Sequence, residues 1–136
     1  MATLLAHITV KDGCEEAFEA IARRLFATSH EVESGLVRYE YWRGSDPRTY
    51  YAHLSFVDFT SFIAHQTSAH HERESPQIAR IVENIRLEWL DPVQGGSPLT
   101  TTAMQDLSAS DDELTRRYAK IFEARIASWW LPFRSQ

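Results

Sequence analysis

The chain has 136 residues, is 43% hydrophobic, and carries 14 Lys and Arg against 19 Asp and Glu, for a formal net charge of −5. This length fits one domain with an appendage, and the net negative charge with scattered basic residues disfavours nucleic acid as a partner. The apolar runs are far shorter than the ~20 residues needed to cross a bilayer, and no secretory signal is visible. Because the single cysteine, Cys14, cannot form an internal disulfide, we expect a cytoplasmic protein.

The first part of the chain predicts a strand followed by a helix. Apolar and other side chains alternate over residues 4–10, with the two-residue period of a strand. Asp12 with Glu15 three residues later forms a capping box, which predicts a helix start. The helix carries one apolar stripe at helical spacing, formed by Phe18, Ile21, Ala22, Leu25 and Phe26.

The middle of the chain predicts a hairpin, a broken helical region and a last strand. Residues 36–43 and 49–56 predict two strands joined by a polar turn. Asp58 is placed to cap a short helix, which breaks at 67–69 before a second helical stretch begins at His70. Pro76 predicts a kink or a restart in that stretch. Residues 86–90 predict the last strand.

The order β-α-β-β-α-β predicts an α+β, ferredoxin-like domain over residues 1–94, with an antiparallel sheet. Both helical regions then lie on one face of the sheet, so the other face needs a partner to cover it.

Residues 95–136 form an appendage to this domain. The glycine-, serine- and threonine-rich stretch 95–109 predicts a flexible linker. A second capping box at 110–113 begins an amphipathic helix over 110–136, whose apolar face extends to Trp129. We expect this helix to pack on a dimer. Attachment to a membrane surface is the alternative, but the mixed acidic and basic charges of the helix disfavour it.

Several segments in order carry a family resemblance: A-H-I-T-V-K-D-G (6–13), G-L-V-R-Y-E-Y-W-R (35–43), D-P (46–47), Y-Y-A-H-L-S-F (50–56) and A-H-Q-T-S-A-H (64–70). Through them, residues 3–92 resemble the antibiotic biosynthesis monooxygenase family of the dimeric α+β barrel superfamily. The resemblance implies a homodimer whose sheets meet as a barrel, with a pocket between sheet and helices. Many relatives use dioxygen, without a cofactor, to oxidise aromatic polyketides or quinols.

The sequence departs from the family at two places. Leu54 and Phe56 stand where the family often has a Glu two residues before a Trp. The Asn-Trp-His set of the haem-degrading relatives does not line up either. We therefore do not expect haem degradation, and fold likeness alone does not select a reaction.

Two histidines and five other residues are the candidates for a site. His65 and His70 match the histidine pair of the family, and a histidine with a pKa near neutrality suits a general base. Either histidine can instead cap the break at 67–69. Tyr39 and Tyr41 are expected on one strand face, where they orient a substrate or simply pack in the core. Apolar walls are expected from Phe56, Phe62 and Trp89.

The remaining histidines and acidic residues predict no further site. His7 and His53 are expected to point toward the dimer barrel instead of the pocket. His70 and Glu74 share a helix face, but two ligands do not make a metal site. We therefore expect no metal and no cofactor.

These features predict a cofactor-independent monooxygenase-like enzyme acting on a phenolic, quinol-type or other aromatic small molecule. One alternative is an isomerase or lyase on a small carbonyl compound, in which the same base forms an enolate that is reprotonated. The other is a non-catalytic small-molecule-binding module.

Overall fold

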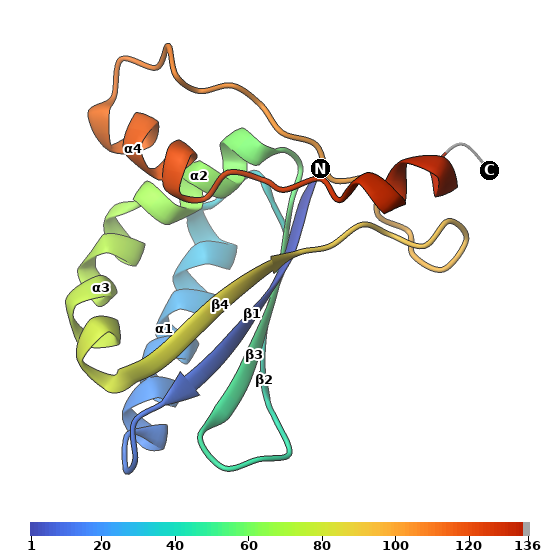
Figure 1. Cartoon of the computed structure of the whole chain (residues 1–136). Coiled ribbons are helices and arrows are strands. Elements are labelled where there is room, and N and C mark those ends of the chain that lie inside the picture. The colour runs from blue at the N-terminus through green and yellow to red at the C-terminus, as the bar shows by residue number, and fades with distance from the viewer. Residues whose placement is uncertain (135–136) are drawn as a thin grey trace.

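The computed structural model describes residues 1–134 and contains a four-stranded antiparallel sheet in the order β2-β3-β1-β4. Helices α1, α2 and α3 all lie on one face of this sheet, as predicted for a ferredoxin-like α+β domain (Figure 1). The elements are β1 (Ala2–Val10), α1 (Glu15–Val32), β2 (Leu36–Arg43), β3 (Thr49–Phe56), α2 (Phe59–Thr67), α3 (Ala69–Ile81), β4 (Val82–Trp89), α4 (Glu113–Ile121) and the 3-10 helix η1 (Ser128–Phe133).

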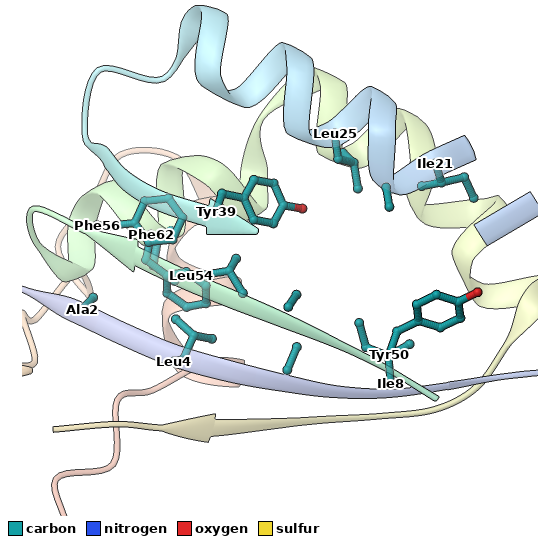
Figure 2. Packing of buried hydrophobic residues seen from close by; sticks show 14 of the residues in the cluster. Ala2, Leu4, Ile8, Ile21, Leu25, Tyr39, Tyr50, Leu54, Phe56 and Phe62 are labelled. Atoms are coloured by element: carbon teal, nitrogen blue, oxygen red, sulfur yellow. The ribbon is translucent and has the colours of Figure 1, made fainter. Parts of the chain in front are cut away.

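The core lies between the sheet and α1 and follows the predicted periodicities. Leu4, Ala6 and Ile8 of β1 are buried, and so are the alternate residues of β3 that pair beside them. Four residues of the α1 stripe close over these side chains, Phe18, Ile21, Ala22 and Leu25, and Figure 2 shows Ile21 and Leu25 among them; Phe26 is exposed. Burying one large apolar side chain stabilises the fold by roughly 1.5–3 kcal/mol, so this shared face determines how helix and sheet meet.

The helix starts correct one expectation and confirm two others. Cys14, and not Asp12, is the N-cap of α1, and its side chain makes no capping bond. Gly13, at φ 78°, takes the left-handed turn that carries the chain from Asp12 to this start. Asp58 caps α2 as predicted, accepting a hydrogen bond from the Ser61 backbone N–H at 2.7 Å. Ser68 ends α2 and caps α3, so the predicted break is confirmed.

α3 continues through Pro76, so the restart that was one of the two expectations does not occur. A proline removes one backbone donor, here the one that would bond the Glu72 carbonyl, and its ring crowds that carbonyl. A bidentate ion pair, Arg24 with Glu74 at 2.8 and 2.9 Å, ties the middle of α3 to α1. The strand that follows, β4, also starts earlier than predicted, at Val82.

The C-terminal region differs most from its prediction. The helix predicted over 110–136 ends at Ile121, and residues 123–127 lie outside any helix before η1 begins at Ser128. Ala124 is buried, and its backbone N–H contacts the Met104 sulfur at 3.3 Å, so tertiary contacts end the helical path there. The last two residues of the predicted range lie outside the described part.

The segment 95–109 is anchored at Thr102, which is fully buried. Its hydroxyl donates to the Leu90 carbonyl at 2.6 Å and accepts from the Thr3 backbone N–H at 3.3 Å. Its own N–H donates to Asp91 at 3.0 Å. This one side chain thus joins the appendage to the ends of β1 and β4.

The sheet face away from α1 carries a mixed set of side chains. It includes the half-buried His7 and His53, as expected, and the exposed Trp42. Figure 1 shows that residues 122–134, here called the C-terminal arm, end in η1 on this side of the sheet. Among residues 1–134, no helix combines the length and the apolar character needed to span a membrane.

Candidate functional site

An open cleft of about 690 Å³ lies between α1 and the β2–β3 side of the sheet, within the range of small-molecule sites. Half of its lining residues are aromatic, and four others are charged. The lining residues are Phe18, Glu19, Ala22, Arg23, Phe26, Glu40, Tyr41, Trp42, Arg43 and Tyr50. We call it the aromatic cleft. Its composition suits a planar ligand that carries a polar or anionic group.

One wall of the aromatic cleft is held by Glu19. Arg43 donates two hydrogen bonds to this carboxylate, at 2.6 and 3.0 Å, and the Tyr50 hydroxyl donates a third at 2.8 Å. The bonds from Arg43 and then Tyr50 lower the pKa of Glu19 to about 2. Burial, together with the bond to Glu19, raises the pKa of Tyr50 to about 12. Glu19 is therefore ionised, and Tyr50 neutral, across the physiological pH range.

The Glu19 network predicts an acid-dependent loss of stability. The folded pKa is about 2, below the ordinary value of 4.5, so the stabilisation is complete above pH 4.5 and is lost as the pH falls toward 2. For a pair this close to solvent we expect about 1 kcal/mol. Urea unfolding of Glu19→Gln against the unaltered chain should show this difference at pH 7 and lose it at pH 2. An unchanged difference at both values would contradict the assignment, and Glu16→Gln on the same helix is the control.

Tyr41 joins the aromatic cleft to the interior. Its hydroxyl is hydrogen-bonded to that of Tyr39 at 2.5 Å, and Tyr39 is almost fully buried. Burial raises the pKa of Tyr41 to about 12 and raises the pKa of Tyr39 well above its ordinary value. Both hydroxyls are thus neutral groups that donate and accept hydrogen bonds.

Behind Tyr39 lies a cluster formed by Glu33, His65 and His70. Nδ1 of His65 lies 2.7 and 2.9 Å from the two carboxylate oxygens of Glu33. Nε2 of His70 lies 3.3 Å from the same carboxylate and 3.2 Å from the hydroxyl of Ser29. The side chain of His65 is 1% exposed, and those of Glu33 and His70 are each 12% exposed.

The electrostatics of this cluster favour an ionised Glu33. Burial opposes the charge, but the hydrogen bond from His65 and the nearby His65 and His70 outweigh it and lower the pKa of Glu33. A carboxylate bonded to Nδ1 fixes the orientation of the imidazole and leaves Nε2 as the free nitrogen. Among the described residues, Nε2 of His65 has no hydrogen-bond partner. The arrangement is that of a histidine oriented to accept a proton at Nε2.

His71 lies beside His65 and is uncharged. Its ring is 4.9 Å from that of His65, and its Nδ1 has no hydrogen-bond partner among residues 1–134. Burial, followed by the nearby His65 and His70, lowers the pKa of His71 to about 3. His71 is thus a neutral wall of the cluster at ordinary pH.

Comparisons with known proteins agree with this fold. The sequence profile of the antibiotic biosynthesis monooxygenase family matches residues 1–74. The chain belongs to this family. No curated protein is similar enough in sequence to count as a relative.

Solved structures of similar fold include two bacterial proteins known by their locus names. Protein PA3566 from Pseudomonas aeruginosa is 29% identical, with 65% of this chain and 90% of that one covered at a TM-score of 0.61. Protein SO0527 from Shewanella oneidensis is 26% identical, with 65% and 87% covered at 0.61. A crystal structure of an antibiotic biosynthesis monooxygenase is 18% identical, with 68% and 99% covered at 0.63, and supports the fold alone.

The seven residues predicted for the site of this family member fall into three places. Tyr41 lines the aromatic cleft, whereas Tyr39, His65 and His70 lie in the layer behind it. Phe56 packs against His65, with ring centroids 5.3 Å apart. Phe62 and Trp89 pack against each other at 5.3 Å in the core between α2 and the sheet, and neither lines the aromatic cleft. Their expected role as substrate-binding walls has no support from this placement.

Sequence reasoning missed Glu33 and the charged wall of the aromatic cleft. Glu33 is the C-cap of α1 and lies 32 residues before His65, a separation that matches no local motif. Phe18 and Phe26 were expected only as part of the apolar stripe of the first helix; Phe18 is buried in the core, and both also line the aromatic cleft. The one signal for Glu33 in the sequence was that two histidines near the core need a hydrogen-bond acceptor close to them.

Proposed function

We propose that this protein is a cytoplasmic, homodimeric monooxygenase that oxidises a phenolic, quinol-type or other planar aromatic molecule with dioxygen and without a bound cofactor. The observation that carries the proposal is a row of contacting side chains that leads from the aromatic cleft inward, hydrogen-bonded between the two tyrosines and in ring contact from Tyr39 to His65. Tyr41 lines the cleft, Tyr39 is bonded to it at 2.5 Å, and the ring of His65 lies 5.0 Å from that of Tyr39.

In this proposal the substrate lies in the aromatic cleft beside Phe18, with its oxygen against the Tyr41 hydroxyl. Its acidic proton passes to Tyr41, and the Tyr41 proton passes to Tyr39. The Tyr39 proton then passes to Nε2 of His65, which requires the two side chains to move from ring contact into a hydrogen bond. Glu33 stabilises the resulting imidazolium, which lowers the cost of removing the proton. His65 is favoured over His70 because Nε2 of His70 is already engaged by Ser29, Ser68 and Glu33.

The oxygenation step balances with dioxygen as the only oxidant. On an anthrone-type substrate, the carbanion left by proton removal donates electrons to dioxygen. A carbon–oxygen bond forms, the oxygen–oxygen bond breaks, and one oxygen atom becomes the new carbonyl. The other oxygen atom leaves as water with the two hydrogens of the original methylene group.

The test is oxygen uptake with anthrone and quinol substrates, followed with an electrode. We expect enzyme-dependent uptake with one carbonyl product per dioxygen, and no turnover when dioxygen is removed. Full turnover under anaerobic conditions would identify an isomerase or lyase instead.

A second candidate, a non-catalytic binding module, is favoured by the position of His65. This side chain is almost completely buried and does not line the aromatic cleft. Such a module would bind an aromatic molecule in the aromatic cleft without any uptake of oxygen, and quenching of tryptophan fluorescence that is lost in Trp42→Phe would detect it.

The homodimer in this proposal is supported by exposed apolar side chains on one side of the sheet. Trp129, Leu131 and Phe133 of the C-terminal arm are all more than half exposed, and so is Trp42 on the open sheet face. Such a concentration of apolar surface in a short arm favours a protein contact. We infer that a second copy of the chain covers the open sheet face and receives the arm.

Sedimentation velocity tests the contribution of the arm. The unaltered chain is expected to sediment as a dimer at micromolar concentration. The double variant Trp129→Ser, Phe133→Ser should raise the dissociation constant at least about tenfold, since losing two interface aromatics typically costs more than 1.4 kcal/mol. Ile121→Ser, which removes an exposed apolar side chain on α4, is the control. A monomer in the unaltered chain would contradict the proposal.

A further inference from the structure

The Glu33–His65–His70 cluster brings one carboxylate and two imidazoles together from three separate elements. Glu33 is the C-cap of α1, His65 belongs to α2 and His70 to the first turn of α3. One ligand atom from each residue lies within 4.8 Å of the others. Imidazole nitrogen and carboxylate oxygen in this ratio are the donor set of Zn²⁺ and related transition-metal ions in proteins.

The distances within the cluster fit donors around one ion as well as they fit shared protons. Ligand bonds of about 2.0–2.2 Å place neighbouring donor atoms roughly 3 Å apart. The carboxylate of Glu33 lies 2.7 Å from Nδ1 of His65 and 3.3 Å from Nε2 of His70. The hydroxyls of Ser29 and Ser68, each 3.2 Å from Nε2 of His70, add neutral oxygen around the same point.

The carboxylate of the cluster is that of Glu33, and not that of Glu74, which the sequence placed on the same helix face as His70. Glu74 shares a helix face with His70, but both of its oxygens are bonded to Arg24. Glu33 has no arginine or lysine among its ion-pair partners within the described chain, so its charge is matched only by the histidines. Its carboxylate is therefore free to bind a cation.

We propose that Glu33, His65 and His70 form a binding site for a divalent transition-metal ion of the Zn²⁺ type, and that this ion switches off the base. A neutral imidazole carries one N–H. An ion on Nδ1 of His65 displaces the proton shared with Glu33, so the remaining ring proton must lie on Nε2. Nε2 then cannot accept a proton from Tyr39. The binding site is independent of the proposed function, whereas the inhibition depends on it.

Metal titration of the full chain tests the site directly. After treatment with a chelator, the protein is titrated with Zn²⁺ by calorimetry and with Co²⁺ by visible absorption. We expect one equivalent to bind, with a cobalt spectrum that reports nitrogen coordination. Glu33→Gln and His70→Asn should each weaken binding at least about tenfold, the loss seen even for residues that only support a ligand. Circular dichroism and thermal unfolding check that both variants fold.

The chain supplies a matched control in His7 and Glu88. This histidine and glutamate are also 2.8 Å apart, but on the open sheet face and outside the three-residue cluster. His7→Asn should leave Zn²⁺ affinity unchanged. Equal loss in His7→Asn and His70→Asn, or no binding by the unaltered chain, would overturn the site.

Oxygen uptake separates the two parts of the inference. Reversible inhibition by one equivalent of Zn²⁺, absent in His70→Asn, supports the switch. Binding at the cluster without inhibition would confirm the site and overturn the switch. Oxygen uptake missing in both the metal-free and the metal-loaded protein would overturn the proposed function and the switch, while calorimetry still decides the site.

Discussion

Replacing His65 with asparagine is expected to lower the rate of oxygen uptake by about 10²- to 10⁴-fold, the usual contribution of a positioned general base. In the proposed function, Nε2 of His65 is the final proton acceptor, and Glu33 holds it in place through Nδ1 at 2.7 Å. An asparagine has no basic nitrogen, so the proton on Tyr39 has no destination. The initial rate with a quinol or anthrone substrate, at saturating dioxygen, is the measurement.

The matched control is His7→Asn, because His7 also contacts a glutamate but lies on the open sheet face. Its rate should equal that of the unaltered chain. Tyr41→Phe tests proton transfer through Tyr41 separately from the base His65. It removes the hydroxyl at the aromatic cleft and should lower the rate while leaving the Glu33–His65 contact intact. An unchanged rate in both His65→Asn and the double variant His65→Ala, His70→Ala would remove histidine as the base.

Replacing Phe62 with alanine is expected to lower the free energy of unfolding by about 3–5 kcal/mol, the usual cost of truncating a buried aromatic. Phe62 is 1% exposed. Its ring contacts those of Phe56, Trp89 and Phe122, with centroids 5.7, 5.3 and 6.2 Å away. Truncation leaves a cavity between α2, the sheet and the C-terminal arm, and none of these elements can collapse into it alone.

Urea unfolding at one fixed protein concentration measures this effect, because stability depends on concentration when a protein dimerises. Phe26→Ala is the control: its ring lies at the aromatic cleft and is 44% exposed, so truncation should cost clearly less. A loss below 1 kcal/mol in Phe62→Ala would show that the aromatic core tolerates repacking. The present packing would then not determine the position of α2 and its histidine.

The candidate site was predictable only in part. Some of its residues are placed by local sequence, whereas others are placed by contacts between elements far apart in the chain. The break at Ser68 is a local event, so sequence placed His65 and His70 correctly on either side of it. Tyr39 and Tyr41 were correctly placed on one face by the two-residue period of a strand. The wall role of Phe62 and Trp89 depended on where α2 sits against the sheet. That placement buries Phe62, leaves Trp89 half-buried against it, and puts neither at the aromatic cleft.

Local chemistry by itself determined β1, β2 and β3, the apolar stripe of α1 and the ferredoxin-like order of elements, because the periods of strands and helices are set by backbone geometry. Only the tertiary structure decided that Glu33 meets His65, that α3 passes through Pro76 and that α4 ends at Ile121. Each of these depends on contacts between residues far apart in the chain. Such contacts compete with local helix preferences of about 1–3 kcal/mol. A short sequence pattern does not indicate whether the tertiary contact or the local preference determines the structure.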